Sequence, residues 1–158
     1  MTVIKRWIAY FLLILISASL QAAPALMTLA LPDGQWRTVD EASLAKLPHI
    51  EFTTTTPWTL GTRQFRGPTL ATLLAAYGVP DAKKAIVSGL NGYQQLVDLT
   101  QFDNLPLTLV RYENGQPLTR RNKGPLWLLL PFTDHPTLDI PAIHNSMVWQ
   151  VTRIEIVN

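Results

Sequence analysis

The sequence has 158 residues, with 13 Lys and Arg side chains against 11 Asp and Glu, and it contains no cysteine. Disulfide bonds and thiolate metal ligands are therefore excluded, and a chain of this length fits one domain that is stabilised by packing. Two of the cations, Lys5 and Arg6, lie close to the N-terminus. Without them the charges balance, so the sequence shows no basic excess of the kind that nucleic-acid binding requires.

The first 22 residues have the three-part layout of a secretory signal peptide. Lys5 and Arg6 precede an apolar stretch over 7–16, and small and polar residues follow it up to Ala22. That stretch is shorter than the roughly 18 to 20 residues of a membrane-spanning helix, which argues against a retained anchor. We therefore expect a cleaved signal peptide over 1–22, a periplasmic location, and one mature domain over 23–158.

The next segments predict a strand, a short helix and a second strand. Thr38 followed by Glu41 has the spacing of a capping box, which marks the start of a helix. A β-branched run favours the second strand, which Pro57 ends because proline lacks a ladder donor. Trp58 therefore falls on a loop. The predicted strands cover 26–31 and 49–56, and the predicted helix covers 41–47.

The clearest helix of the sequence lies between Pro68 in its first turn and Gly78 as its C-terminal cap. Its apolar residues recur at the spacing of one helical face, which predicts a core-facing stripe. The stripe consists of Leu70, Leu73, Leu74 and Tyr77.

Two hairpins and a closing strand complete the prediction. Asn91-Gly92 lies between strands predicted over 85–90 and 93–97, and Asn114-Gly115 follows a strand over 105–112; both pairs are strong hairpin signals. Alternating residues over 148–157 predict the last strand. Many short strands with two or three helices indicate a single α+β domain that is mainly β.

Three cations precede a fully apolar strand. Arg120, Arg121 and Lys123 come just before Gly124-Pro125 and the strand over 126–130. An apolar run of this kind is buried on both faces, whereas unpaired cations stay at its mouth. The cations fit either a ligand-binding rim or the solvated end of a hairpin, and their density beside a buried strand favours the rim.

The order of motifs resembles the molybdopterin-binding domain of the sulfite oxidase fold, in its small exported members. The resemblance covers nearly the whole mature chain. The motifs are the strand and loop over 53–58, Phe65-Arg66-Gly67-Pro68-Thr69-Leu70, Leu90-Asn91-Gly92-Tyr93, Glu113-Asn114-Gly115-Gln116-Pro117-Leu118, Lys123-Gly124-Pro125-Leu126 and Trp149-Gln150-Val151.

In catalytic members of that family, a cysteine after the Thr-rich strand ligates molybdenum. Here the loop is Thr55-Thr56-Pro57-Trp58, so the resemblance implies a pterin-shaped pocket without molybdenum redox chemistry. It also implies a pterin-binding sensor whose partner is the periplasmic domain of an inner-membrane protein that regulates cyclic-di-GMP. The alternatives are a molybdopterin-dependent oxidoreductase whose metal is held without cysteine, and an interaction module of the same fold with a collapsed pocket.

A pterin ligand requires aromatic faces and polar groups around its edge. Trp58, Tyr93 and Trp149 are the expected faces, because aromatic stacking stabilises a flat ligand, whereas Trp127 lies within an apolar strand and is expected in the core. Asn91 is first a hairpin residue that needs a positive φ, and its amide can also contact a ligand edge.

Charged groups complete the expected ligand site. Arg120, Arg121 and Lys123 are the candidate cations, and either Asp98 or Asp134 can accept from the amino edge of a pterin. The three histidines lack metal-ligand spacing, and no serine lies in a Gly-x-Ser-x-Gly context, so neither a closed zinc site nor a hydrolase is expected.

Overall fold

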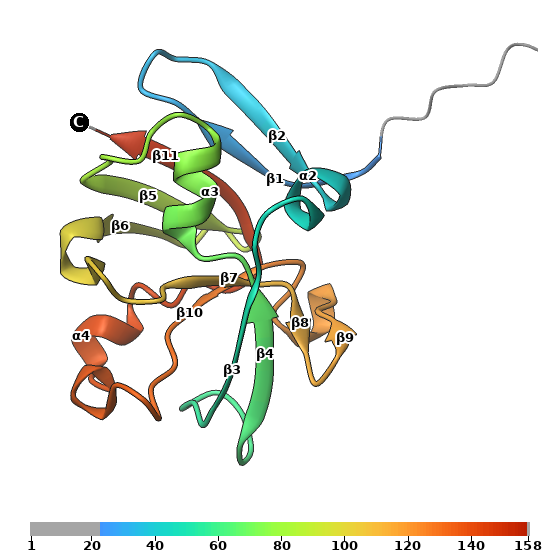
Figure 1. The fold of residues 1–158 in the computed structure, drawn as a ribbon, viewed down its shortest axis with the longest axis vertical. Helices are drawn as coiled ribbons and strands as arrows, with labels where there is room; N and C mark the ends of the chain where they lie inside the picture. The colour runs from blue at the N-terminus through green and yellow to red at the C-terminus, as the bar shows by residue number, and fades with distance from the viewer. Residues whose placement is uncertain (1–22, 158) are drawn as a thin grey trace, which may run out of the picture.

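A five-stranded sheet forms the upper half of the molecule (Figure 1). The computed structural model describes residues 23–157, so the predicted signal peptide lies outside the described residues. The strand order is β2-β1-β11-β5-β6; β1 and β11 run parallel, and all other neighbours are antiparallel. The strands are β1 (Ala25–Ala30), β2 (Trp36–Asp40), β5 (Lys84–Gly89), β6 (Gln94–Asp98) and β11 (Val151–Val157).

A four-stranded sheet and a two-stranded ladder form the lower half. The sheet order is β3-β4-β8-β9, and β7 pairs antiparallel with β10. The strands are β3 (Ile50–Thr54), β4 (Arg63–Gly67), β7 (Thr108–Val110), β8 (Tyr112–Glu113), β9 (Gln116–Pro117) and β10 (Trp127–Leu129).

Short helices connect and cover the sheets. Helix α3 lies over one face of the five-stranded sheet (Figure 1) and buries Leu70, Leu73 and Leu74, which confirms the predicted stripe. No helix in the described part of the chain is long and apolar enough to cross a membrane. The helices are α2 (Glu41–Ala45), α3 (Leu70–Ala76), α4 (Pro141–His144) and the 3₁₀ turns η1 (Leu99–Phe102), η2 (Arg120–Asn122) and η3 (Pro136–Leu138).

The β7–β10 ladder lies at the centre of the core. All residues of β7 and β10 are buried, which confirms that the apolar run before Pro131 is a strand covered on both faces. Strand β4 passes so close to β7 that a Cβ added at Gly67 would lie 2.0 Å from the carbonyl oxygen of Leu109. This close approach packs the four-stranded sheet against the β7–β10 ladder.

Helix α2 begins at Glu41 as predicted, but the residues that cap the two helices differ from the prediction. The N-cap of α2 is Asp40, not Thr38: the Asp40 carboxylate accepts from the Ser43 backbone N–H at 2.8 Å, and the Ser43 hydroxyl accepts from the Asp40 N–H at 2.9 Å. Thr69 caps α3, so Pro68 precedes the helix instead of occupying its first turn. In both cases the side chain of a residue one or two positions after the predicted one, a carboxylate in Asp40 and a hydroxyl in Thr69, accepts from a backbone N–H of the first helical turn.

The two hairpins are confirmed, with one correction to their backbone. Asn114 and Gly115 both have positive φ, at 49° and 76°, as a tight turn requires. In the β5–β6 hairpin only Gly92 has positive φ, at 82°. Asn91 does not need the left-handed conformation that we predicted, because its side-chain oxygen instead accepts from the Tyr93 N–H at 3.2 Å.

The closing strand begins at Val151, three residues later than predicted. Gln150 has a φ of 52°, which breaks the extended backbone, and Trp149 before it pairs with Trp127 in an isolated bridge. The observed strands and short helices nevertheless confirm a single α+β domain that is mainly β.

Candidate functional site

An aromatic pocket of about 350 Å³ opens where three chain segments meet. The loop after β3 contributes one side, the β5–β6 turn a second, and α4 with the segment that follows it the third. The pocket is lined by Trp58, Asn91, Tyr93, Pro141, His144, Asn145, Met147, Val148 and Trp149. The structure therefore brings four of the seven predicted site residues together, namely Trp58, Asn91, Tyr93 and Trp149.

Trp58 is the centre of the aromatic cluster. Its ring centroid lies 5.8 Å from that of Trp127, 5.9 Å from Trp149 and 5.1 Å from His144, each in an edge-on arrangement. Edge-to-face contacts of this kind stabilise aromatic pairs and restrict their orientation. Strand β3 ends at Thr54, earlier than the predicted end before Pro57, and Pro57 and Trp58 lie in the turn that follows. Trp58 therefore forms a fixed wall of the pocket.

Trp149 is more accessible and is held by its backbone. Its side chain is 36% exposed, and the residue pairs with buried Trp127. The next residue, Gln150, donates its backbone N–H to the Lys123 carbonyl at 2.8 Å and its side-chain amide to the Arg120 carbonyl. These two bonds anchor the kinked residue Gln150, so Trp149 presents a ring to the pocket from a fixed backbone position.

Polar groups stand at the hairpin side of the pocket. The Tyr93 hydroxyl lies 3.1 Å from the Asn145 carbonyl oxygen and 3.2 Å from the side-chain oxygen of Gln95. The first of these bonds links the β5–β6 hairpin to the segment after α4. Asn91 braces the turn through its bond to the Tyr93 N–H.

His144 is a pocket residue that the sequence did not single out. Its Nε2 lies 2.7 Å from Asp139 Oδ1, and its ring packs edge-on against Trp58 and Phe132, with centroids 5.1 and 5.4 Å away. The sequence around His144 carries no signal that would place it beside Trp58. Only the folding of α4 against the Trp58 loop brings the two together.

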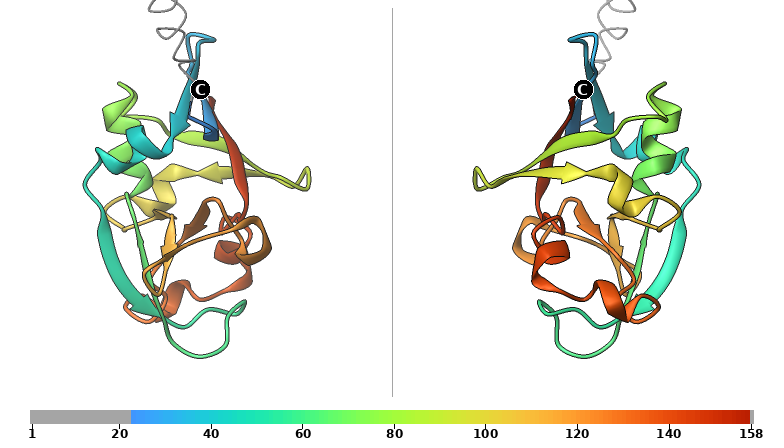
Figure 2. Two further views of the ribbon diagram at one scale, coloured as in Figure 1. Left: turned by 90° about the vertical axis from the view of Figure 1, so that its right-hand side faces the viewer. Right: turned by 90° about the vertical axis from the view of Figure 1, so that its left-hand side faces the viewer.

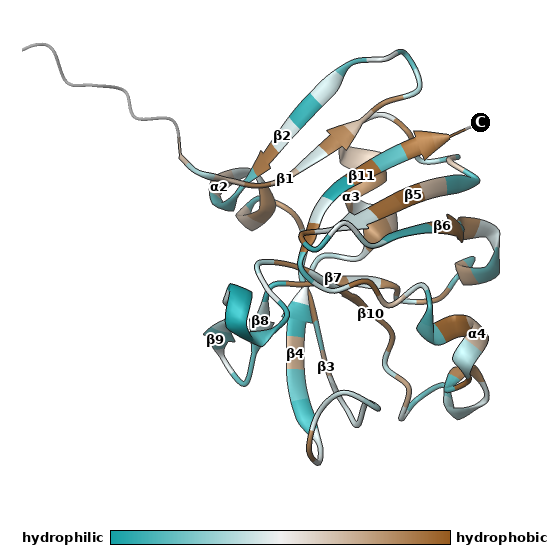
Figure 3. Cartoon of the chain, turned by 180° about the vertical axis from the view of Figure 1, so that it is seen from behind, coloured by the Kyte–Doolittle hydropathy of each residue, from teal (hydrophilic) through white to brown (hydrophobic). Residues whose placement is uncertain are grey.

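The predicted basic rim does not line this pocket. Arg120 and Arg121 are exposed on η2, in the strongly hydrophilic segment beside β8 and β9 (Figure 3). Lys123 lies over the Trp127 ring, with its Nζ 5.3 Å from the centroid. Trp127 is fully buried, as predicted, and its ring also packs edge-on against Trp58, with the centroids 5.8 Å apart. No lining residue is a carboxylate or a Lys or Arg.

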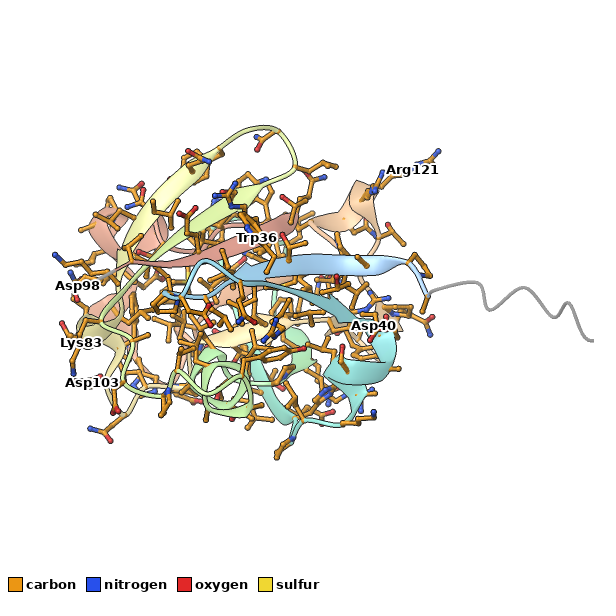
Figure 4. The ribbon with its side chains drawn as sticks, turned by 90° about the horizontal axis from the view of Figure 1, so that it is seen from above. Trp36, Asp40, Lys83, Asp98, Asp103 and Arg121 are labelled. Carbon is orange, nitrogen blue, oxygen red and sulfur yellow. The ribbon has the colours of Figure 1, made fainter. Side chains whose placement is uncertain are left out.

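Neither candidate carboxylate lines the pocket. Asp98 lies at the end of β6 remote from Tyr93, on the opposite side of the molecule from Arg121 (Figure 4). Hydrogen bonds from the hydroxyl and N–H of Thr100 hold the pKa of Asp98 below its usual value, and the same bonds cap η1. Asp134 is exposed in the loop after Phe132. The structure assigns Asp98 a capping role instead of ligand recognition.

The donor set does not fit the metal that the fold implies. The resemblance implies a cysteine thiolate as the protein ligand of molybdenum, and the sequence supplies no cysteine. Residues 23–157 also hold no group of three or more His, Asp and Glu side chains that could bind a metal ion. At the end of β3, the Thr54 hydroxyl bonds to the Thr133 hydroxyl at 3.0 Å, and in the loop that follows, the Thr56 hydroxyl bonds to that of Thr59 at 2.8 Å.

Comparison with known proteins places this architecture in a family. The family model "Oxidoreductase molybdopterin binding domain" matches residues 38–133. That match covers the Trp58 loop and the β5–β6 turn, but not the pocket residues after 140. The comparison with curated proteins returned no match.

A solved structure supports the same fold. The sulfane dehydrogenase SoxCD from Paracoccus pantotrophus superposes with a TM-score of 0.61 at 18% sequence identity. The similarity covers 84% of this chain and 38% of the SoxCD chain, so the present protein spans well under half of that chain. The fold and the family match together lead to one conclusion: the chain belongs to the oxidoreductase molybdopterin binding domain family and has its sulfite oxidase-like fold.

Proposed function

We propose that this protein is a periplasmic, non-enzymatic pterin-binding protein that relays ligand occupancy to the periplasmic domain of an inner-membrane regulator of cyclic-di-GMP. The observation that carries the proposal is the open aromatic pocket. Family membership makes a pterin the natural ligand class. The missing thiolate ligand favours binding of the pterin without molybdenum.

The size and lining of the pocket suit a flat bicyclic ligand. A volume of about 350 Å³ is within the range of small-molecule sites. Trp149 and Tyr93 offer partly exposed rings, and stacking a flat heterocycle on an aromatic side chain contributes about 1–3 kcal/mol per ring. The amides of Asn91 and Asn145 provide both donors and acceptors for its edge.

The charge of the lining favours a neutral pterin. A phosphate group in a binding site requires cations or clustered N–H donors, since an unpaired charge is costly to remove from water. The pocket lining contains no Lys or Arg, and Arg120, Arg121 and Lys123 lie elsewhere. An unphosphorylated pterin is therefore the form that we expect to bind.

The family also supports a second candidate, a molybdopterin-dependent oxidoreductase. Such an enzyme would hold molybdenum without cysteine from this chain. The third possibility considered from the sequence, a ligand-free module with a collapsed pocket, is disfavoured by the volume of the cavity.

Analysis of the purified protein distinguishes these candidates. The protein is purified from the periplasm of its own host, and its bound pterin is identified by native mass spectrometry while molybdenum is quantified by elemental analysis. A metal-free pterin at near one equivalent supports the proposal. Stoichiometric molybdenum overturns it in favour of the oxidoreductase, and the lack of both species, together with no binding of added tetrahydropterin, leaves the interaction module.

The relay requires a surface whose affinity for the membrane protein differs between the empty and the occupied state. Pull-down of the periplasmic domain of a neighbouring membrane regulator, with and without tetrahydropterin, tests this step. Equal binding in both conditions would contradict the relay while leaving pterin binding intact.

A further inference from the structure

The free edge of β6 lacks the features that protect the opposite edge of the same sheet. Strand β2 carries Arg37 and a register shift against β1, two devices that hinder edge-to-edge pairing. Strand β6 reads Gln-Gln-Leu-Val-Asp, contains no Lys, Arg or Pro, and pairs with β5 without a register shift. Figure 2 shows that the hairpin formed by β5 and β6 also projects from the body of the molecule.

The hairpin register identifies the groups that face this edge. The Gly89 N–H donates to the Tyr93 carbonyl at 2.8 Å, so Tyr93 directs its backbone groups toward β5. Backbone groups of successive residues alternate in direction along an antiparallel strand. Gln94, Leu96 and Asp98 therefore point their N–H and C=O groups away from β5, and in the described chain β6 has no second neighbouring strand.

A chain of side-chain hydrogen bonds connects this edge to the aromatic pocket. The Gln95 amide donates to the Leu96 carbonyl at 2.9 Å, which covers the central acceptor of the free edge. The same amide group accepts from the Tyr93 hydroxyl, which also reaches Asn145 across the pocket. A hydroxyl has one proton, so Tyr93 serves either Gln95 or Asn145 at a given moment.

We propose that β6 pairs antiparallel with β6 of a second copy of this chain, and that ligand in the pocket promotes the pairing. A ligand that engages the Tyr93 hydroxyl removes a support of the Gln95 side chain and so uncovers the Leu96 carbonyl. The pairing of β6 with β6 is inferred from the strand geometry alone, whereas its control by ligand rests on the proposed function. Because coupling is reciprocal, pairing also raises ligand affinity.

A register centred on Leu96 makes the strand complementary to itself. In that register Leu96 lies opposite its own counterpart, and Gln94 lies opposite the counterpart of Asp98. All outward backbone groups then have partners, and no acid faces another acid. The Leu96 side chain is 55% exposed, so the two copies bring these apolar side chains together on one face. Two-fold contacts of this kind are the commonest in homo-oligomers.

Three variants test the edge by sedimentation equilibrium at protein concentrations up to about 1 mM, the range of weak interfaces. Gln95→Ala removes the cover and is expected to tighten the dimer by about tenfold or more without ligand. Leu96→Pro removes an N–H that the β5 ladder does not use, so the fold survives while pairing is lost. Leu96→Val keeps that N–H and is the matched control, expected to remain dimer-competent. Slower hydrogen exchange of the Leu96 amide in the dimer is the local readout.

The outcomes separate the edge contact from the pocket. The proposed β6–β6 pairing is wrong if Gln95→Ala stays monomeric over the whole concentration range. It is also wrong if folded Leu96→Pro still forms dimers. Tetrahydropterin binding that leaves dimerisation unchanged overturns its control by ligand but not the proposed function. If tetrahydropterin does not bind, the proposed function is wrong. The comparison of Gln95→Ala with Leu96→Pro still shows whether two copies pair through β6.

Discussion

At the scale of single residues, the pocket distinguishes Trp58 from Trp149, both of which the sequence placed in the ligand site. Trp58 touches Trp127, Phe132, His144 and Trp149 and is part of the packing, whereas Trp149 is partly exposed and anchored by its backbone. Removing Trp58 therefore affects both the fold and the ligand, because this partly buried ring packs against the core and its loss leaves a gap there. Trp149 is the better position for isolating the binding contribution.

Trp149→Ala is expected to weaken binding of tetrahydropterin by about 10- to 100-fold, the loss of one stacking partner. Isothermal titration calorimetry measures the affinity, and circular dichroism checks the fold. Trp36→Ala is the control, since Trp36 is exposed on β2, does not line the pocket and stacks against Arg153 instead. An unchanged affinity in folded Trp149→Ala would remove this ring from the site.

At the scale of elements, two short helices depend on ionised caps. The Ser43 hydroxyl and N–H hold the pKa of Asp40 below its usual 3.8, and Thr100 does the same for Asp98. A carboxylate whose pKa is lowered on folding contributes stability that is present above the unfolded value and is lost as the pH falls through the folded value. The caps of α2 and η1 therefore stabilise the protein at neutral pH and lose this effect in acid.

The double variant Asp40→Asn/Asp98→Asn keeps the size of both side chains and removes their titration. Its melting temperature is expected to lie below that of the unmodified protein at pH 7, and the difference is expected to shrink as the pH drops below 3.8. Thermal denaturation followed by circular dichroism from pH 7 to acid measures this difference. A constant difference across the range would show that the caps do not act through their charge.

The contact between β4 and β7 is the tightest junction between the smaller sheet and the core. Gly67→Ala places a Cβ 2.0 Å from a backbone oxygen that cannot move without displacing β7. We expect a loss of at least about 3 kcal/mol in the free energy of unfolding, measured by urea denaturation. Gly34→Ala is the control, because its φ of 79° costs only about 1–2 kcal/mol and its new Cβ meets no atom within 4 Å.

At the scale of the whole molecule, ligand occupancy and stability are linked. A ligand that binds only the folded state stabilises it by about 2.7 kcal/mol at a concentration of 100 times its dissociation constant. Tetrahydropterin is therefore expected to raise the melting temperature by about 5–11 °C, at about 2–4 °C for each kcal/mol of stabilisation. Differential scanning fluorimetry measures the shift, and Trp149→Ala should reduce it at the same ligand concentration. A shift that survives in Trp149→Ala would point to binding outside the pocket.

The sequence alone determined the local features of this protein. Hairpin dipeptides, prolines and the Leu stripe of α3 act over a few residues, so they predicted most of the strands, the main helix, the core position of Trp127 and the fold class. Strands β2 and β4 were not predicted. The order of motifs indicated the family. The same local logic failed where a competing acceptor lay nearby, as with Asp40 and Thr69 at the helix starts, and at Asn91, whose side chain replaced a strained backbone.

Only the tertiary structure decided which side chains share the site. Trp58, Tyr93, His144 and Trp149 come from three segments that meet after the sheets have packed, so their spacing in the sequence carries no trace of their contact. The same packing left Arg120, Arg121 and Lys123 outside the pocket lining, because the two arginines lie on η2 and Lys123 packs over the ring of buried Trp127. Hydrophobic periodicity indicates which face of one helix or strand is buried, whereas the lining of a pocket depends on which faces of different elements meet.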